Sequence, residues 1–84
     1  MKGGLNMKPF NPLKKKRLEL CLTKEDISNK INIKLSTIKH YETGERNPTV
    51  KDIIYLCRVG YQMSNEEIIE YLEYLDKIRK EWLL

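Results

Sequence analysis

Apolar residues recur three and four positions apart along most of the chain, which is the spacing of an amphipathic helix. The strict alternation of apolar and polar residues that marks a half-buried strand is not found. The pattern therefore predicts an all-α fold of five helices, with a long C-terminal helix. The expected ranges are 12–20, 23–31, 35–43, 50–58 and 65–84.

Residues that favour helix ends stand at these boundaries. Capping side chains and Pro suit the first turn, whereas Gly in a left-handed conformation suits the residue after the last turn. The expected signals are Asn11 followed by Pro12, Thr23 with Asp26, Gly44, Gly60, and Ser64 with Glu67.

The inward-facing positions of the first four helices predict one small core. We expect it to contain Leu13, Leu20, Cys21, Ile27, Ile31, Ile38, Tyr41, Val50, Ile53, Ile54 and Cys57. The two cysteines stand far apart without a second ligand nearby, so we expect reduced thiols in or near the core and no metal or other cofactor.

Length and composition limit the class of protein. The chain has 84 residues, 40% hydrophobic and 33% charged, which fits a single globular domain without a catalytic cleft. Its apolar runs are too short to cross a membrane, and its start lacks the apolar segment of a secretory signal, so we expect a cytoplasmic protein. Residues 1–10 are expected to form a flexible basic tail.

Charge is distributed unevenly along the sequence. Residues 1–17 carry six basic side chains and no acidic one, whereas residues 64–84 carry three basic and six acidic ones. Such a molecule would be oriented by a polyanion. The alternative is that lysine-rich helices simply keep the chain in solution.

The expected third helix has one polar face. Ser36, Lys39, His40 and Thr43 follow at the spacing of a single helical side, and a helix is narrow enough for the DNA major groove. These side chains can bond to base edges or phosphates. The alternative is an ordinary solvated helix face.

The stretch "KKKRLELCLTKEDISNKINIKLSTIKHYETGERNP" resembles the Xre/Cro-like helix-turn-helix family of phage and bacterial repressors. The shared markers are a leucine and polar cap, a small residue between two helices, Ser-Thr-Ile opening the recognition helix, an aromatic-Glu-x-Gly ending and a following proline. Asn32 stands where the family usually has Gly, Lys34 where it usually has a capping hydroxyl, and Leu35 where it usually has a polar groove residue.

The resemblance implies a role for several residues. Arg17 and Glu42 match a structural ion pair. The implied base contacts are Leu35, Ser36, Thr37, Lys39 and His40, and the implied phosphate contacts are Thr23, Lys24, Lys34, Thr43, Arg46 and Asn47.

The expected fifth helix is about 30 Å long, too long to be covered by the core of so small a domain. Its apolar residues recur at heptad spacing, and we expect residues 64–84 to form a homodimer through Tyr71, Leu75, Ile78 and Trp82. The alternative is a long last helix that folds back onto residues 11–63, the expected helix-turn-helix domain.

Together these features predict a sequence-specific regulator of transcription that binds double-stranded DNA as a dimer, and the resemblance implies that it acts as a repressor. The lone His40 has neither a carboxylate partner at useful spacing nor a nucleophile, so we do not expect an enzyme. The alternative function is a helix-turn-helix module that binds a protein, such as an antitoxin or a phage-encoded inhibitor.

Overall fold

The computed structural model describes residues 10–83, and the side chains of residues 10–79. Within this part of the chain all regular structure is helical, as the sequence predicts. The helices are α1 (Pro12–Glu19), α2 (Lys24–Ile31), α3 (Leu35–Thr43), α4 (Val50–Tyr55), which continues as the π-helical turn η2 (Leu56–Gly60), and α5 (Asn65–Leu83). The expected tail lies outside the described residues except for Phe10.

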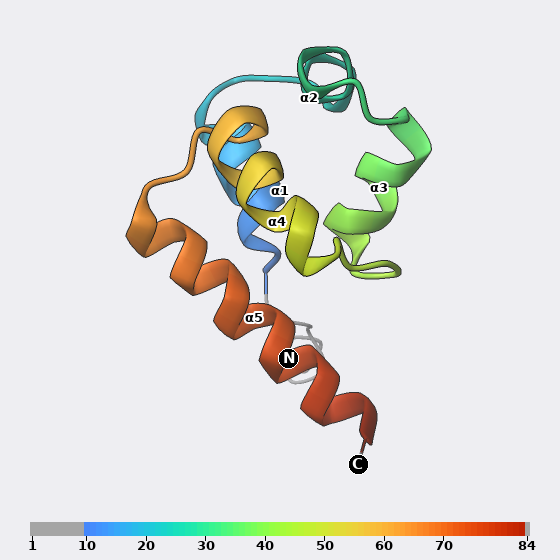
Figure 1. Cartoon of the computed structure of the whole chain (residues 1–84), viewed down its shortest axis with the longest axis vertical. Coiled ribbons are helices and arrows are strands. Elements are labelled where there is room, and N and C mark those ends of the chain that lie inside the picture. The colour runs from blue at the N-terminus through green and yellow to red at the C-terminus, as the bar shows by residue number, and fades with distance from the viewer. Residues whose placement is uncertain (1–9, 84) are drawn as a thin grey trace, which may run out of the picture.

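Helices α1, α2, α3 and α4 group together, and α5 runs along one side of the group. Figure 1 shows α4 in front of α1, with α3 at the edge of the molecule and α2 at the end opposite the C-terminus. Helix α5 lies antiparallel to α4 and extends past the other helices. It is the longest of the described helices, with 19 residues.

The predicted caps are confirmed at Asn11, Thr23, Gly44 and Ser64, whereas Gly60 lies inside η2 without a left-handed backbone. The Asn11 carboxamide oxygen accepts from the Leu13 amide at 2.9 Å, and Thr23 and Asp26 form a reciprocal capping box. Ser64 and Glu67 do the same for α5, while Gly44 ends α3 with a φ of 86°. These boundaries follow from short-range hydrogen bonding alone, which is why the sequence reveals them.

The core lies where α1, α2, α3 and η2 meet α5. Ile27, Ile38 and Tyr61 are fully buried, and the core also contains Leu13, Ile31, Ile53, Leu56, Cys57, Met63, Ile68, Tyr71, Tyr74 and Ile78. Leu22, Ile33, Tyr41 and Leu75 are partly buried against it. Burial raises the pKa of the Cys57 thiol to about 11, which leaves this thiol protonated and unreactive at neutral pH.

Three of the predicted core residues are exposed. Val50 and Ile54 are 88% and 54% exposed, because only the side of α4 that bears Ile53 meets the core. Helix α4 gives way to the wider turn η2, where Leu56 and Cys57 take over the inward side. Cys21 is exposed as well, because it follows α1 in a left-handed turn with a φ of 58°.

The seam residues expected on α5 pack inside their own chain. Tyr71 and Ile78 are buried, Leu75 is partly buried, and Trp82 lies outside the residues whose side chains are described. Ile78 and the Tyr74 hydroxyl lie against Gly44, the residue that ends α3. The heptad spacing of Tyr71, Leu75 and Ile78 therefore describes how α5 folds back on the domain. Among the side chains of α5 that the structure describes, the exposed large apolar ones are Ile69 and Leu72.

Candidate nucleic-acid interface

The turn between α2 and α3 holds the two helices at a fixed angle. Asn32 adopts the left-handed conformation with a φ of 57°, and its amide donates to the Ser28 carbonyl. The Ile33 amide donates to the same carbonyl at 3.2 Å, while the Ser28 hydroxyl donates back to the Ile33 carbonyl. A three-residue connection closed this tightly leaves one side of α3 uncovered.

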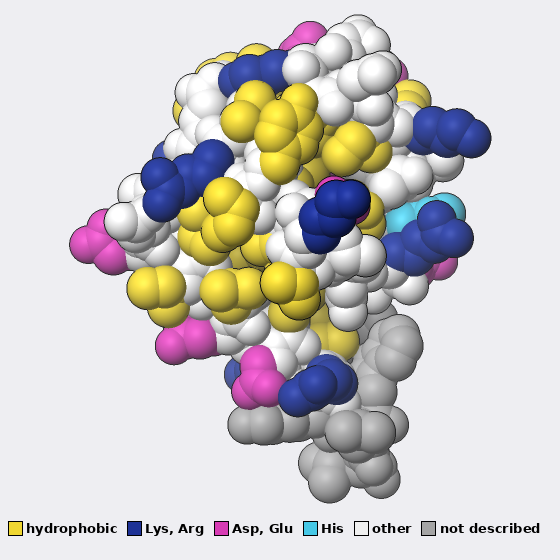
Figure 2. All heavy atoms as spheres, viewed as in Figure 1, with side chains coloured by type: hydrophobic (Ala, Val, Ile, Leu, Met, Phe, Trp, Pro, Cys, Tyr) yellow, Lys and Arg dark blue, Asp and Glu magenta, His cyan; other side chains and the backbone are white. Residues whose placement is uncertain are grey.

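The side chains of α3 differ in burial between its inner and outer sides. Ile38 and Glu42 are buried, whereas Ser36, Lys39 and Thr43 are exposed and His40 is half-buried. We call Ser36, Lys39, His40 and Thr43 the α3 face. The other two residues expected to contact bases, Leu35 and Thr37, are half-buried along its borders. Figure 2 shows dark blue and cyan side chains on the edge of the molecule where α3 lies.

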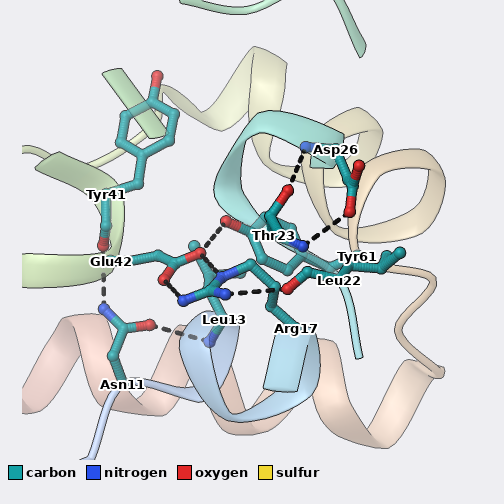
Figure 3. A network of polar contacts seen from close by, with 9 residues as sticks. All are labelled: Asn11, Leu13, Arg17, Leu22, Thr23, Asp26, Tyr41, Glu42 and Tyr61. Carbon is teal, nitrogen blue, oxygen red and sulfur yellow. Dashed lines mark hydrogen bonds and ion pairs between the residues drawn. The ribbon is translucent and has the colours of Figure 1, made fainter. Parts of the chain in front are cut away.

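A buried polar network holds the inner side of α3 (Figure 3). Arg17 donates to both carboxylate oxygens of Glu42, at 2.8 and 3.0 Å, and the Tyr61 hydroxyl donates to Glu42 at 2.8 Å. Arg17 also donates to the Leu22 carbonyl. The hydrogen bond to Glu42 raises the pKa of Arg17, so the guanidinium remains charged. The last turn of α3 is thereby bonded to α1 and to Tyr61, the residue that follows η2.

Asn11 connects α5 to this support. While its carboxamide oxygen caps α1, its amide group donates to the Tyr41 carbonyl at 2.9 Å and to the Tyr74 hydroxyl at 3.3 Å. The sequence indicated the cap but not these two contacts, since they bridge residues far apart in the chain.

Glu45 lies at the C-terminal end of the α3 face and is not among the predicted site residues. Its carboxylate accepts from the Thr43 hydroxyl at 3.0 Å and lies 3.8 Å from the His40 imidazole. The left-handed turn at Gly44 directs the chain back toward His40, and that αL signal could have indicated the contact. A carboxylate here repels phosphate and can accept a hydrogen bond from cytosine.

Two of the predicted phosphate contacts already have partners within the chain. The Thr23 hydroxyl accepts from the Asp26 amide, and the Thr23 amide donates to the Asp26 carboxylate, which lowers the Asp26 pKa. The Thr43 hydroxyl donates to the His40 carbonyl or to Glu45. At the start of α2 this leaves the half-buried Lys24 as the cationic group that can reach a phosphate.

Exposed cationic or amide side chains stand at both ends of α3. Lys34 precedes the helix, whose first turn receives no side-chain cap, while Arg46 and Asn47 follow it. The Arg46 amide donates to the His40 carbonyl at 3.2 Å, which ties this loop to the end of the helix. The structure thus brings the basic residues before and after α3 to the borders of the α3 face.

The lysines of α1 have a different environment. Lys16 lies 3.0 Å from Glu67 and Lys15 lies 3.9 Å from Glu70, both on α5. The basic and acidic stretches of the sequence therefore partly neutralise each other in the fold. The exposed Lys34 and Arg46, at the borders of α3, form no ion pair of this kind with the described side chains of α5.

The described residues offer little room for a metal ion or a small molecule. They contain no cluster of His, Cys, Asp or Glu that could bind a metal ion. A hollow between α1 and α5, lined by residues such as Pro12, Met63 and Glu67, has a volume of about 10 Å³, which is room for no more than a water molecule. None of the described helices is long and apolar enough to cross a membrane.

Comparison with known families agrees with this geometry. The model of the helix-turn-helix family HTH_3 matches residues 13–59, more than half of the chain. The match runs from α1 to η2 and includes the α2–α3 turn. No curated protein and no solved structure matches the chain significantly.

Proposed function

The chain belongs to the Xre/Cro-type helix-turn-helix family, and we propose that it is a sequence-specific regulator of transcription that reads the DNA major groove with α3. A domain of this type implies DNA binding, and the family is typically non-enzymatic. The proposed base contacts are Leu35, Ser36, Thr37, Lys39 and His40. The proposed phosphate contacts are Thr23, Lys24, Lys34, Thr43, Arg46 and Asn47.

The observation that carries the proposal is the difference between the outer and the inner side of α3. Its outer side bears hydrogen-bonding side chains, and its inner side is fixed by Glu42 to a buried network. A helix held this rigidly can present side chains to base edges in one register, as direct readout requires. An ordinary solvated helix would need no buried ion pair beneath it.

The regulatory mode that we propose is repression by a homodimer inside the cell. Two copies on one duplex would place two α3 helices about 34–36 Å apart, one turn of DNA, and would cover the promoter that they bind. Repression rests on the family resemblance alone.

Selection of bound sequences from a random duplex pool tests the proposal. We expect a consensus with two-fold symmetry, and binding that weakens steeply with added salt as counterions are released. A pool that returns no enriched sequence would contradict sequence-specific readout. An enriched site without symmetry would retain DNA binding and reject the homodimer on DNA.

The second candidate function is a protein-binding module. The observation that favours it is the set of exposed apolar side chains on α4 and α5, since such surfaces commonly contact proteins. A module that binds only protein would show no salt-dependent affinity for duplex DNA, which separates the two candidates.

A further inference from the structure

An acidic side chain lies among the cationic and polar groups of the α3 face. The Glu45 carboxylate accepts from the Thr43 hydroxyl at 3.0 Å and lies 3.8 Å from Nε2 of His40. The Glu45 side chain is nevertheless 68% exposed, so its carboxylate is held in place and remains open to a ligand. Because a carboxylate repels phosphate, a DNA ligand of Glu45 must be a hydrogen-bond donor, and the donors in the major groove belong to the bases.

The backbone after α3 places Glu45 on this face although Glu45 lies outside the helix. Gly44 turns the chain with a φ of 86°. The Glu45 amide then lies 3.4 Å from the Thr43 hydroxyl, and the next amide, of Arg46, donates to the His40 carbonyl. These contacts hold the loop against the last turn of α3, so the position of the carboxylate follows from the loop and not from helical spacing.

The neighbouring imidazole of His40 has one ring nitrogen available to a ligand. Its Nδ1 is enclosed and has no hydrogen-bond partner among the described residues. A hydrogen on Nδ1 would be buried without an acceptor, which is costly, so the neutral ring carries its hydrogen on Nε2. At 3.8 Å from Glu45, this N–H group is not engaged in a hydrogen bond with the carboxylate. The α3 face therefore presents a donor and an acceptor side by side.

We propose that Glu45 determines specificity by accepting a hydrogen bond from cytosine N4 in one C·G pair of the DNA site. His40 donates to the guanine of the same pair. In the major groove a C·G pair presents the N4 amino group at one end, with the guanine O6 and N7 acceptors beside it, which matches an acceptor next to a donor. In an A·T pair the N6 amino group stands between two acceptors, adenine N7 and thymine O4, and both repel a carboxylate. The inference rests on the proposed function and adds to it a residue that is not among the proposed base contacts.

Competition binding with the intact chain and with Glu45→Gln tests the proposal. The probes are the selected duplex, a series with each base pair changed in turn, and a scrambled duplex. For the intact chain, changing the assigned C·G pair to T·A should weaken binding about tenfold, because thymine O4 then faces the carboxylate. In Glu45→Gln this preference should fall below about threefold, since the amide can also donate. Glu45→Gln should bind the scrambled duplex more tightly, because it no longer repels phosphate.

A second variant separates base reading from charge. Glu45→Asp keeps the charge but withdraws the carboxylate from the base, so the preference for the C·G pair should fall while binding to the scrambled duplex stays the same. The matched control is Glu66→Gln, which removes an exposed charge at the start of α5. It should leave the preference for the C·G pair at its original value.

Three results would overturn the proposal while leaving DNA binding intact. The first is a Glu45→Gln variant that binds every duplex more tightly by the same factor, which would assign Glu45 to phosphate repulsion alone. The second is an unchanged base preference in both variants at position 45. The third is a preference lost at an A·T pair. An intact chain that selects no sequence would contradict both this inference and the proposed function.

Discussion

Two helix surfaces of the molecule are open to solvent but differ in chemistry and in what lies beneath them. The first is the polar α3 face, and the second, which we call the α4–α5 face, consists of the exposed apolar residues Val50, Ile54, Tyr55, Val59, Ile69 and Leu72. Beneath the α3 face lies a buried polar network centred on Glu42. Beneath the α4–α5 face lie apolar side chains such as Ile53, Leu56 and Ile68. Directional hydrogen bonds fix a helix in one rotation, as reading base edges requires, whereas apolar packing suffices for a surface that contacts protein.

The largest expected effect comes from the support of the α3 face. Glu42→Gln removes the charge that pairs with buried Arg17, and breaking such a pair should reduce the free energy of unfolding by about 3 to 5 kcal/mol. Urea titration followed by circular dichroism would measure this loss. Glu45→Gln makes the same chemical change at an exposed position and should stay within about 0.5 kcal/mol of the original protein. Equal stability of the two variants would show that Glu42 does not support the fold.

The second prediction tests the support of the α4–α5 face with adjacent isoleucines. Ile53 is 8% exposed and Ile54 is 54% exposed. Ile53→Ala should cost about 2 to 5 kcal/mol of stability because it leaves a cavity, and Ile54→Ala should cost much less in the monomer. Thermal unfolding at low protein concentration measures both. Equal losses of stability in the two variants would mean that Ile53 and Ile54 are buried to the same extent, which requires α4 to be rotated about its axis.

The residues that sequence reasoning placed correctly are those set by local chemistry. Caps at Asn11, Thr23 and Ser64, and the left-handed residue Gly44, depend on neighbours within a few positions. The polar face of α3 was equally predictable, since a helix of known ends has a fixed periodicity.

The side of α4 that is buried was not predictable in this way. Val50 and Ile54 lie next to the inward side, and which side of α4 meets the core depends on packing against residues far away in the sequence. The same reason explains Tyr71 and Ile78, whose heptad spacing fits a dimer seam as well as a contact with the chain's own core. Glu45 was missed because its contact with His40 depends on the turn after Gly44.

The third prediction separates base reading from positioning on the α3 face. Lys39→Ala or His40→Ala should cost about 1 to 3 kcal/mol on the selected duplex and relax its sequence preference. Lys24→Ala or Arg46→Ala should weaken binding to all duplexes alike and reduce the salt slope by roughly one. Competition between selected and scrambled duplexes at several salt concentrations distinguishes the two patterns. A uniform loss for Lys39→Ala would assign Lys39 to phosphate contact.

The smallest expected effect concerns the contact between α5 and α1. Glu67 accepts from the Ser64 amide and from Lys16, and these bonds lower the Glu67 pKa below its usual value of 4.5. The folded state therefore binds this proton less readily than the unfolded state, so the stabilisation is complete above about pH 4.5 and is lost as the pH falls through the folded pKa. Because the group is partly exposed, we expect less than about 1 kcal/mol.

Glu67→Gln should flatten the acid side of the stability profile, measured by urea titration between neutral pH and about pH 3. Glu66→Gln, at the exposed neighbouring position, is the control and should leave the slope nearly unchanged. Equal slopes in the original protein and Glu67→Gln would mean that the hydrogen bonds at Glu67 mark the start of α5 without stabilising its packing. The contact with α1 would then depend on the apolar core, on the Lys15–Glu70 ion pair and on the hydrogen bond from Asn11 to Tyr74.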